Sequence, residues 1–332
     1  MPDIPPIDNR DLVRLVRRVF PRAQAVSVEP ASERLVVVYR AHVDEAVFYL
    51  RVAEEPGQDL TTDAQIFDRV GALGATVPAV VTAEAAPNEL PLSYMIVTEI
   101  PGGSLAQAGT DDEARRAARL AGRDTAIINS LEVSGFGWVQ RNGAEQLTAE
   151  MDSYGDFVVS YLPEPWPGWL AGIFEPQHLA ALEGIIDSER CRPVGHGQLA
   201  HGDLDITHIY IHDGAYTGII DFGEMRGAEH AFDLGHFQLH DGETRPVELL
   251  DSFLDGYAEV AALADDHREA IRISAILQGL RQLSLWLGPQ RNNSPTSRLA
   301  RLRIAELANL LEYKPAAQQR THDWPRQRRP VR

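Results

Sequence analysis

The sequence predicts an α+β fold of two lobes: a small N-terminal lobe built on an antiparallel sheet, and a larger, mainly helical C-terminal lobe. Short apolar runs separated by polar turns occupy residues 25–100, which is typical of an antiparallel meander. Beyond the Pro-Gly-Gly break at 101–103, longer segments carry apolar residues at helical spacing. With 332 residues, the chain is long enough for two such lobes.

The N-terminal lobe is expected to begin with a helix over 11–20, because apolar residues recur there at helical spacing until Pro21. A second helix is expected over 62–74, and its apolar face is formed by Ile66, Phe67, Val70 and Leu73. Strands are expected where apolar residues alternate or cluster between turns, at 25–29, 35–41, 46–53, 77–83 and 94–100.

The C-terminal lobe is expected to be helical around a single hairpin. Amphipathic spacing predicts helices at 111–131, 152–162, 177–186, 246–263, 268–287 and 297–311. Between them, Ile209–His212 and Tyr216–Ile220 flank the turn Asp213-Gly214-Ala215, which is a short β-hairpin signal.

These patterns divide the chain into an N-terminal lobe of residues 1–98, a hinge at 99–104 and a C-terminal lobe over 105–313. The compact stretch 199–237 contains the hairpin and most of the motifs discussed below. Residues 314–332 are basic and almost devoid of apolar side chains, so we expect a disordered tail.

The composition excludes several classes of protein. The chain has 31 Lys and Arg against 48 Asp and Glu, a formal net charge of −17, which argues against a nucleic-acid binder with a general basic surface. Cys191 is the single cysteine, so an intramolecular disulfide or a cysteine zinc cluster is excluded. Because no signal-like or bilayer-length apolar segment occurs, we expect a cytoplasmic protein without a membrane partner.

Two motifs lie on either side of the hairpin. His201-Gly202-Asp203-Leu204 precedes it, and Ile219-Ile220-Asp221-Phe222-Gly223 ends it. Since a hairpin brings its two ends together, the carboxylates of Asp203 and Asp221 can converge on one cleft. Phosphoryl transfer requires such a pair, with one carboxylate near the attacking hydroxyl and one near metal ions that neutralise the phosphates.

These motifs resemble those of the aminoglycoside phosphotransferase and choline kinase superfamily, which are relatives of protein kinases. The resemblance covers roughly residues 25–313, and Val97–Gly102 is similar to the family's strand-to-linker segment. It implies a bilobal protein-kinase-like fold. It also implies transfer of the γ-phosphate of ATP or GTP, with Mg²⁺ or Mn²⁺, to a hydroxyl group of a small molecule.

The resemblance assigns a role to each matching residue. Asp203 corresponds to the catalytic base that receives the acceptor hydroxyl, and Asp221 to the metal ligand on the nucleotide side. Asp233, in Phe232-Asp233-Leu234-Gly235, corresponds to an Asp that braces the catalytic loop, and His201 belongs to the same supporting group.

His208 departs from the family pattern, which has an Asn metal ligand at this position. Some macrolide-phosphorylating members are similar in carrying His here. Three interpretations follow: His208 contacts the metal, forms a supporting hydrogen bond, or marks a partly degenerate site. Imidazole is a softer ligand than an amide oxygen, whereas Mg²⁺ prefers oxygen.

Several N-terminal residues are expected to bind the nucleotide. Arg51 stands where protein kinases have the Lys that holds the phosphates, and Ser32 lies in a glycine-poor phosphate-covering loop. The backbone of Thr98, Glu99 and Ile100 is expected to face the adenine. Gln65 stands at the position of the helix Glu that pairs with the basic residue, and Asp63 and Asp68 lie close by, so this partner is not assigned.

The acceptor is expected beside Asp203. Acidic residues such as Asp205 and Glu224 suit a polycationic aminoglycoside, although a solvated acidic surface explains them equally. A macrolide is the next candidate, because of His208. His236 is a further candidate contact. Trp166 either packs in the core or forms a wall of the acceptor pocket.

Two other functions remain open. A nucleotide-binding or regulatory protein without turnover is consistent with His208, Gln65 and the glycine-poor loop. A metallohydrolase would instead use Asp203 and Asp205 with a group of histidines spread over this region, namely His201, His208, His212, His230, His236 and His240.

Overall fold

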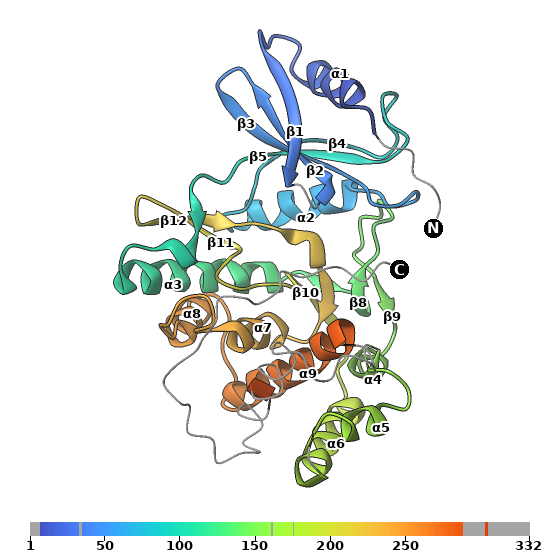
Figure 1. The fold of residues 1–332 in the computed structure, drawn as a ribbon, viewed down its shortest axis with the longest axis vertical. Helices are drawn as coiled ribbons and strands as arrows, with labels where there is room; N and C mark the ends of the chain where they lie inside the picture. Colours follow the sequence, from blue (N-terminus) through green and yellow to red (C-terminus); the bar gives the residue numbers. More distant parts are fainter. Residues whose placement is uncertain (1–6, 33–34, 161, 175, 288–302, 305–332) are drawn as a thin grey trace.

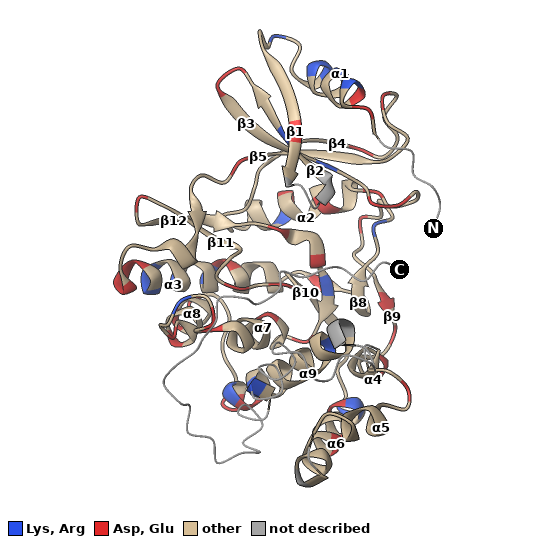
Figure 2. Cartoon of the chain, in the orientation of Figure 1, with Lys and Arg blue, Asp and Glu red and all other residues tan. Residues whose placement is uncertain are grey.

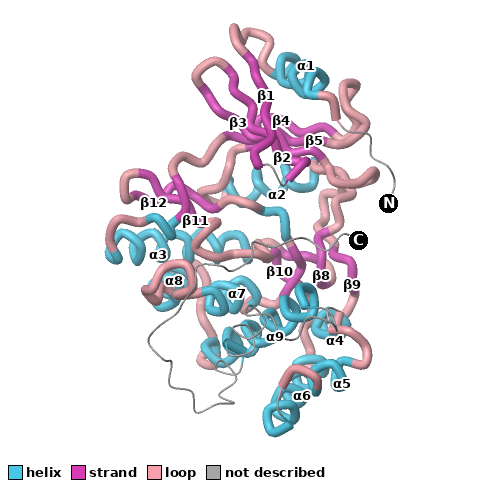
Figure 3. Tube along the Cα trace, in the orientation of Figure 1, coloured by secondary structure: helices cyan, strands magenta, loops and turns pink. Residues whose placement is uncertain are grey.

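The structure is a computed structural model that describes residues 7–32, 35–160, 162–174, 176–287 and 303–304. Its two lobes are visible in Figure 1. Figure 3 shows that the N-terminal lobe contains a strongly twisted sheet and that most helices lie in the C-terminal lobe. The predicted α+β architecture is therefore confirmed. The expected tail at 314–332 lies outside the described residues, as does most of the helix expected at 297–311.

The N-terminal lobe is an antiparallel sheet with two helices. Its strands run in the order β1-β2-β3-β5-β4. Helix α2 lies on the side of the sheet that faces the other lobe, and α1 packs against β1 (Figure 1). The elements are α1 (Asn9–Val19), β1 (Val26–Ser32), β2 (Leu35–Val43), β3 (Ala46–Val52), α2 (Thr61–Ala72), β4 (Val80–Glu84) and β5 (Tyr94–Thr98).

The C-terminal lobe has helices around two small sheets. One sheet has the order β12-β11-β6, and the other has the order β7-β10-β13-β8-β9. The strands are β6 (Gly103–Ser104), β7 (Glu132–Val133), β8 (Phe136–Val139), β9 (Ala149–Met151), β10 (Gly197–Ala200), β11 (Ile209–His212), β12 (Ala215–Ile219) and β13 (Arg226–Ala228). The helices are α3 (Asp111–Asn129), α4 (Tyr154–Val159), α5 (Trp166–Ala171), α6 (Pro176–Cys191), α7 (Phe232–His240), α8 (Leu250–Tyr257) and α9 (His267–Leu287), and 3₁₀ turns occur at Leu105–Gln107 and Phe222–Glu224.

Helix α3 shows how local sequence signals start an element. Thr110 accepts a hydrogen bond from the Glu113 backbone while the Glu113 side chain accepts one from the Thr110 backbone, so the two residues form a capping box. The first turn is acidic (Figure 2), which suits the positive end of the helix dipole. Gly122 then allows α8 to pack closely, because a Cβ there would lie 1.9 Å from the Phe253 carbonyl oxygen.

The structure corrects several expected elements. The sheet of β7, β10, β13, β8 and β9 was not predicted, because its strands are two to four residues long and pair across large sequence separations. The helix expected at 246–263 is reduced to α8, and Leu73 is exposed rather than on a buried face of α2. Among the described residues, none of the helices combines the length and apolar character that a bilayer span requires.

The hinge is tied to the hairpin that contains the predicted motifs. Strand β6 pairs with β11, with Ser104 opposite Tyr210. Gly102 has φ +99°, and a Cβ there would lie 1.9 Å from the Ile211 carbonyl oxygen. Only glycine fits this approach. The lobe connection is thereby held next to the loop between β10 and β11, which we call the catalytic loop (residues 201–208).

Candidate active site

Asp233, on the first turn of α7, organises the start of the catalytic loop. Its side chain is buried and accepts hydrogen bonds from the backbone N–H groups of His201 (2.9 Å) and Gly202 (3.0 Å). The amide of Asn129, on α3, donates a third hydrogen bond at 2.8 Å and a further one to the Leu199 carbonyl. The loop, α7 and α3 are therefore joined through one carboxylate.

Replacing Asp233 with Ala is expected to lower the free energy of unfolding by about 3 kcal/mol or more, because buried donors lose their acceptor and each costs about 1–3 kcal/mol. Urea denaturation measures the change. Asp68→Ala, at an exposed position on α2, is the matched control and is expected to change stability little. Equal stability of the two variants would contradict the bracing role of Asp233.

Gly202 allows the loop to pass close to the segment after Asp221. Its φ is +92°, and a Cβ there would lie 1.8 Å from the carbonyl oxygen of Glu224. Any other residue would push these backbones apart. The Gly in the His-Gly-Asp motif is thus a steric requirement for bringing Asp203 and Asp221 to one site.

His201 links the catalytic loop to the end of the hairpin. Its ring is fully buried, with Nε2 2.9 Å from the Ile220 carbonyl oxygen, while Nδ1 accepts the Asp203 N–H at 3.4 Å. Nε2 therefore carries the proton and the ring is neutral. Burial, with the neighbouring His208, lowers the pKa of His201 and agrees with this protonation state.

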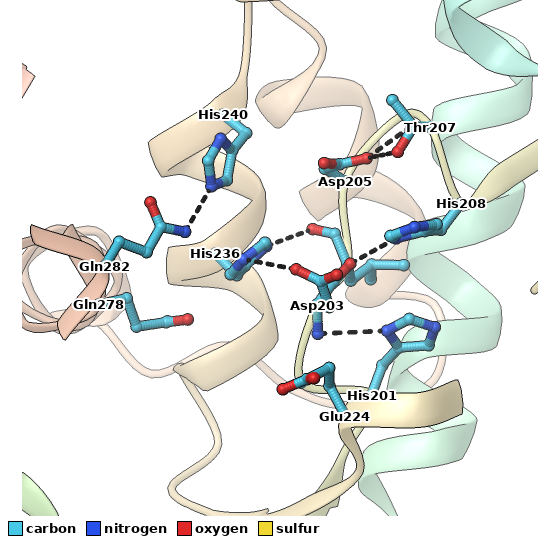
Figure 4. Close-up of polar contacts among 12 residues, drawn as sticks. His201, Asp203, Asp205, Thr207, His208, Glu224, His236, His240, Gln278 and Gln282 are labelled. Carbon is cyan, nitrogen blue, oxygen red and sulfur yellow. Dashed lines mark hydrogen bonds and ion pairs between the residues drawn. The ribbon is translucent and has the colours of Figure 1, made fainter. Parts of the chain in front are cut away.

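His208 lies between the backbone of Asp203 and the side chain of Asp221. Its Nδ1 lies 2.6 Å from the Asp203 carbonyl oxygen, and its Nε2 lies 3.7 Å from Asp221 Oδ2 (Figure 4 shows the first contact). The carbonyl can only accept a hydrogen bond, so Nδ1 carries a proton and Nε2 is directed toward Asp221. Burial opposes the charged ring, but Asp205, Asp203 and Asp221 outweigh it and raise the pKa of His208.

Asp221 lies at a strained point of the backbone. It has φ +65° and ψ +59°, in the left-handed region, and its side chain is 55% exposed. Asp tolerates this conformation better than most residues. The following Phe222 packs edge-on against Phe67 of α2 and against the ring of His201. The carboxylate is therefore open to solvent at a point where both lobes meet.

The partner of Arg51 is Asp63, on the first turn of α2. Arg51 Nη1 lies 3.3 Å from Asp63 Oδ1, and the Asp63 side chain is fully buried. Arg141, in the loop between β8 and β9, also donates to Asp63 at 2.7 Å and 3.2 Å, and to the Gly223 carbonyl at 3.3 Å. This cluster joins α2, β3 and the segment after Asp221.

Sequence reasoning noted Asp63 near Gln65 without assigning it as the partner, and it missed Arg141. Asp63 had a usable signal: it precedes Ile66, Phe67 and Val70 by three, four and seven residues, so it belongs to the same buried helix face. A carboxylate on a buried face requires a cation. Arg141 had no such signal, because it lies 78 residues from Asp63 in a loop.

The structure modifies the expected adenine-facing segment. The Thr98 N–H donates to the Ala79 carbonyl at 2.9 Å, so this N–H is not free for an adenine. The contact of the remaining backbone groups of 98–100 with adenine stays a prediction. Glu99 and Ile100 follow the end of β5, where the chain leaves the sheet. Ser32 ends β1, its side chain is not among the described parts, and the adjoining residues 33–34 also lie outside them.

The residues predicted to contact the acceptor differ in their surroundings. Asp205 accepts hydrogen bonds from the backbone and hydroxyl of Thr207, at the turn of the catalytic loop. Glu224 pairs with Arg226 at 2.6 Å, and the Arg226 guanidinium stacks on Trp138. Trp166 is buried in the apolar cluster of α4, α5, α6 and α9, so the structure favours the core-packing interpretation.

His236 is also placed differently from the expectation. It is buried, and it contacts Asp203 Oδ1 through Nε2 at 3.3 Å and the Leu204 carbonyl through Nδ1 at 3.0 Å. Both ring nitrogens are therefore occupied by the catalytic loop. The expectation that His236 contacts the acceptor is wrong, since no nitrogen remains for it.

The donor set at Asp221 and His208 fits a divalent ion shared with a nucleotide. A Mg²⁺ site of this kind takes only one or two protein carboxylates and completes its coordination with phosphate oxygens and water. In the part of the chain that the structure describes, no group of three or more His, Cys, Asp or Glu is arranged to hold a metal by itself. The metallohydrolase interpretation therefore gains no support there.

Comparison with known families gives an independent result. The phosphotransferase enzyme family, APH, matches residues 28–273. The chain belongs to this family. The predicted relationship to the aminoglycoside phosphotransferase superfamily is thereby confirmed, and with it a general role as a small-molecule phosphotransferase. A comparison with curated proteins gave no match.

Solved structures of family members share the fold. Aminoglycoside phosphotransferase APH(4)-Ia, in a ternary complex with ADP and hygromycin B, matches with a TM-score of 0.62 at 14% identity, over 92% of this chain and 100% of the other. A candidate fructosamine-3-kinase from Thermobifida fusca matches with a TM-score of 0.58 at 20% identity, over 90% and 99%. A candidate aminoglycoside phosphotransferase from Ralstonia eutropha gives 0.59 at 12% identity, over 91% and 98%. These likenesses establish the kinase-like fold.

Proposed function

We propose that this family member transfers the γ-phosphate of ATP or GTP to a hydroxyl of a small-molecule acceptor, with Asp203 as the catalytic base. The observation that carries the proposal is the position of His208, whose two nitrogens face the Asp203 carbonyl and the Asp221 carboxylate. One imidazole thus joins the residue near the attacking hydroxyl to the residue near the phosphates. These contacts support the proposal that both acidic residues serve one site, as in-line phosphoryl transfer requires of its base and its metal ligand.

In the proposed reaction, the acceptor oxygen forms a bond to the γ-phosphorus while the bond from that phosphorus to the β–γ bridging oxygen breaks. The leaving diphosphate keeps the electron pair, and the hydroxyl proton moves to Asp203. Asp233 and His201 hold the loop that orients Asp203. Arg51, fixed by Asp63, supplies a positive charge from β3 for the phosphates.

Asp221 and His208 would hold a divalent cation. Bound Mg²⁺ or Mn²⁺ would neutralise negative charge on the phosphate oxygens. The Nδ1 hydrogen bond to Asp203 directs Nε2 of His208 to the side of Asp221, and such hydrogen bonds orient imidazole ligands. A nitrogen donor favours Mn²⁺ more than an amide oxygen would.

For the acceptor, we propose a cationic, aminoglycoside-type molecule first and a macrolide second. Asp203 and Asp205 stand two positions apart in the catalytic loop, and the chain carries a net charge of −17. Both features attract a polycation.

A phosphotransfer screen tests the proposed function. Purified protein is incubated with ATP or GTP, Mg²⁺ or Mn²⁺, and a panel of aminoglycosides, macrolides and small metabolite alcohols. We expect acceptor-stimulated release of nucleoside diphosphate and an acceptor that gains one phosphate by mass spectrometry. Thermal stabilisation by nucleotide without turnover on the whole panel would instead support a nucleotide-binding protein that has lost catalysis.

A further inference from the structure

His236 is buried directly behind the proposed catalytic base. It lies on α7, one turn after Asp233, and its side chain is 4% exposed. The Nε2 atom is 3.3 Å from Asp203 Oδ1, and Figure 4 draws this contact as a dashed line. A single short helix thus braces the backbone of the catalytic loop through Asp233 and contacts its functional carboxylate through His236.

The partners of His236 define its protonation state. Nδ1 faces the carbonyl oxygen of Leu204 at 3.0 Å, and Nε2 faces the carboxylate of Asp203. Both partners only accept hydrogen bonds, so both nitrogens carry protons and the ring is an imidazolium. Burial alone would lower the pKa of His236, but the hydrogen bond and charge of Asp203 outweigh burial and raise it to about 9.

The surroundings of His236 also favour a cation. Two carboxylates of the catalytic loop lie on one side. The ring of His240 lies next to it, tilted by 43° with ring centroids 4.7 Å apart, and α9 contributes uncharged amides. The groups facing His236 from these three elements are Asp203, Asp205, His240, Gln278 and Gln282. The ring of His240 is itself held by Glu243 (3.0 Å) and by the Gln282 amide (2.8 Å).

The ion pair changes what Asp203 can do. Burial alone would raise the pKa of Asp203, but the hydrogen bond from His236 and the charges of nearby histidines outweigh burial and hold it well below its usual range. The ion pair therefore favours the anionic form of Asp203, which orients the hydroxyl and takes its proton as the new oxygen–phosphorus bond forms. Such a group acts mainly by orienting the hydroxyl, which suits phosphoryl transfer because positioning and electrostatics supply most of the catalysis.

We propose that His236 is a positioning residue whose buried imidazolium holds Asp203 Oδ1 and so fixes the orientation and the charge of the catalytic carboxylate. This inference rests on the proposed function, because it assigns to His236 an effect on transfer through Asp203. Since His236 touches neither nucleotide-binding elements nor β3, it acts on turnover rather than on nucleotide affinity.

Steady-state kinetics of two variants test the proposal. His236→Gln keeps an amide donor for Asp203 but no charge, and His236→Leu keeps neither. We expect kcat to fall about 10–100-fold in His236→Gln, the range found when supporting hydrogen bonds of a site are removed, and further in His236→Leu, with the nucleotide KM unchanged. His178→Gln, at a buried His on α6, away from the catalytic loop, is the matched control and should keep the wild-type kcat.

The pH profile separates positioning from mere packing. The wild-type kcat is expected to fall as the pH rises through about 9, where His236 loses its proton; the profile of His236→Gln should lack this fall. Folded His236 variants with wild-type kcat and the wild-type alkaline fall would overturn the proposal.

A spectroscopic measurement keeps the two proposals separable. The ¹⁵N chemical shifts of the His236 ring should report two protonated nitrogens at pH 7, independently of any acceptor. A neutral ring in an active enzyme would refute the role of His236 alone. Absence of phosphotransfer on every acceptor would refute the proposed function, and with it the catalytic effect assigned to His236.

Discussion

The Asp203→Asn variant is expected to lose phosphotransfer by about 10²–10⁴-fold, which is the usual contribution of a positioned acid–base group. An amide keeps the size of the side chain, and its carbonyl oxygen can still accept the hydrogen bond from His236. It cannot take the proton of the acceptor hydroxyl, and it removes the negative charge that orients that hydroxyl. Initial rates of diphosphate release with a saturating acceptor measure the loss.

The same variant should leave the nucleotide site intact. The side chains of Asp233 and His201 hold the catalytic loop through hydrogen bonds from backbone N–H groups. The substitution does not change these groups. We therefore expect nucleotide to stabilise Asp203→Asn against heat as much as it stabilises the wild type. Full activity in Asp203→Asn would contradict its assignment as the base.

The Asp221→Asn variant is expected to lose activity by about 10²–10³-fold, because electrostatic stabilisation of the transferred phosphoryl group is usually worth this much. Asn tolerates the left-handed backbone at this position as well as Asp does, so the local fold should persist. The metal-dependent part of nucleotide binding should disappear as well. Thermal-shift titrations with ATP, with and without Mg²⁺ or Mn²⁺, measure this part.

The His208→Asn variant tests the second proposed metal ligand. His208→Asn introduces the amide that the family usually has here, while keeping a hydrogen-bond donor for the Asp203 carbonyl. Activity with Mg²⁺ should rise relative to activity with Mn²⁺, since Mg²⁺ prefers oxygen ligands. If Asp221→Asn still binds nucleotide with full metal dependence, Asp221 is not the metal ligand.

Elements that depend on nearby residues were predicted from the sequence, whereas elements that depend on distant residues were not. The hairpin was predicted correctly, because Asp213-Gly214 and the flanking apolar residues act within ten positions: Ile209 pairs with Ile219 as the turn requires. The strands of the N-terminal sheet were found for the same reason. In contrast, β10 pairs with β13 and β7, and such short strands exist only because distant segments meet.

The residues of the candidate site also fall into those that motifs identify and those that only tertiary contacts identify. Asp203, Asp221 and Asp233 stand in motifs that can be read one residue at a time. The partner of Arg51 was not identified from Gln65, although the helical spacing of Asp63 contained the information. The sequence did not show that the Thr98 N–H is engaged by Ala79, because Ala79 lies on a neighbouring segment that the motif does not include.

The amino-acid order alone determined the α+β class, the hairpin that brings two acidic motifs together, and the kind of chemistry those motifs support, because turns, periodicity and motifs are local. Tertiary structure decided the charge states: it placed the imidazolium of His236 against Asp203, and Asp63 between Arg51 and Arg141. The physical reason is that hydrogen bonds and ion pairs depend on distances of a few ångströms between side chains, and burial strengthens them. Both conditions arise only when residues far apart in the chain are packed together.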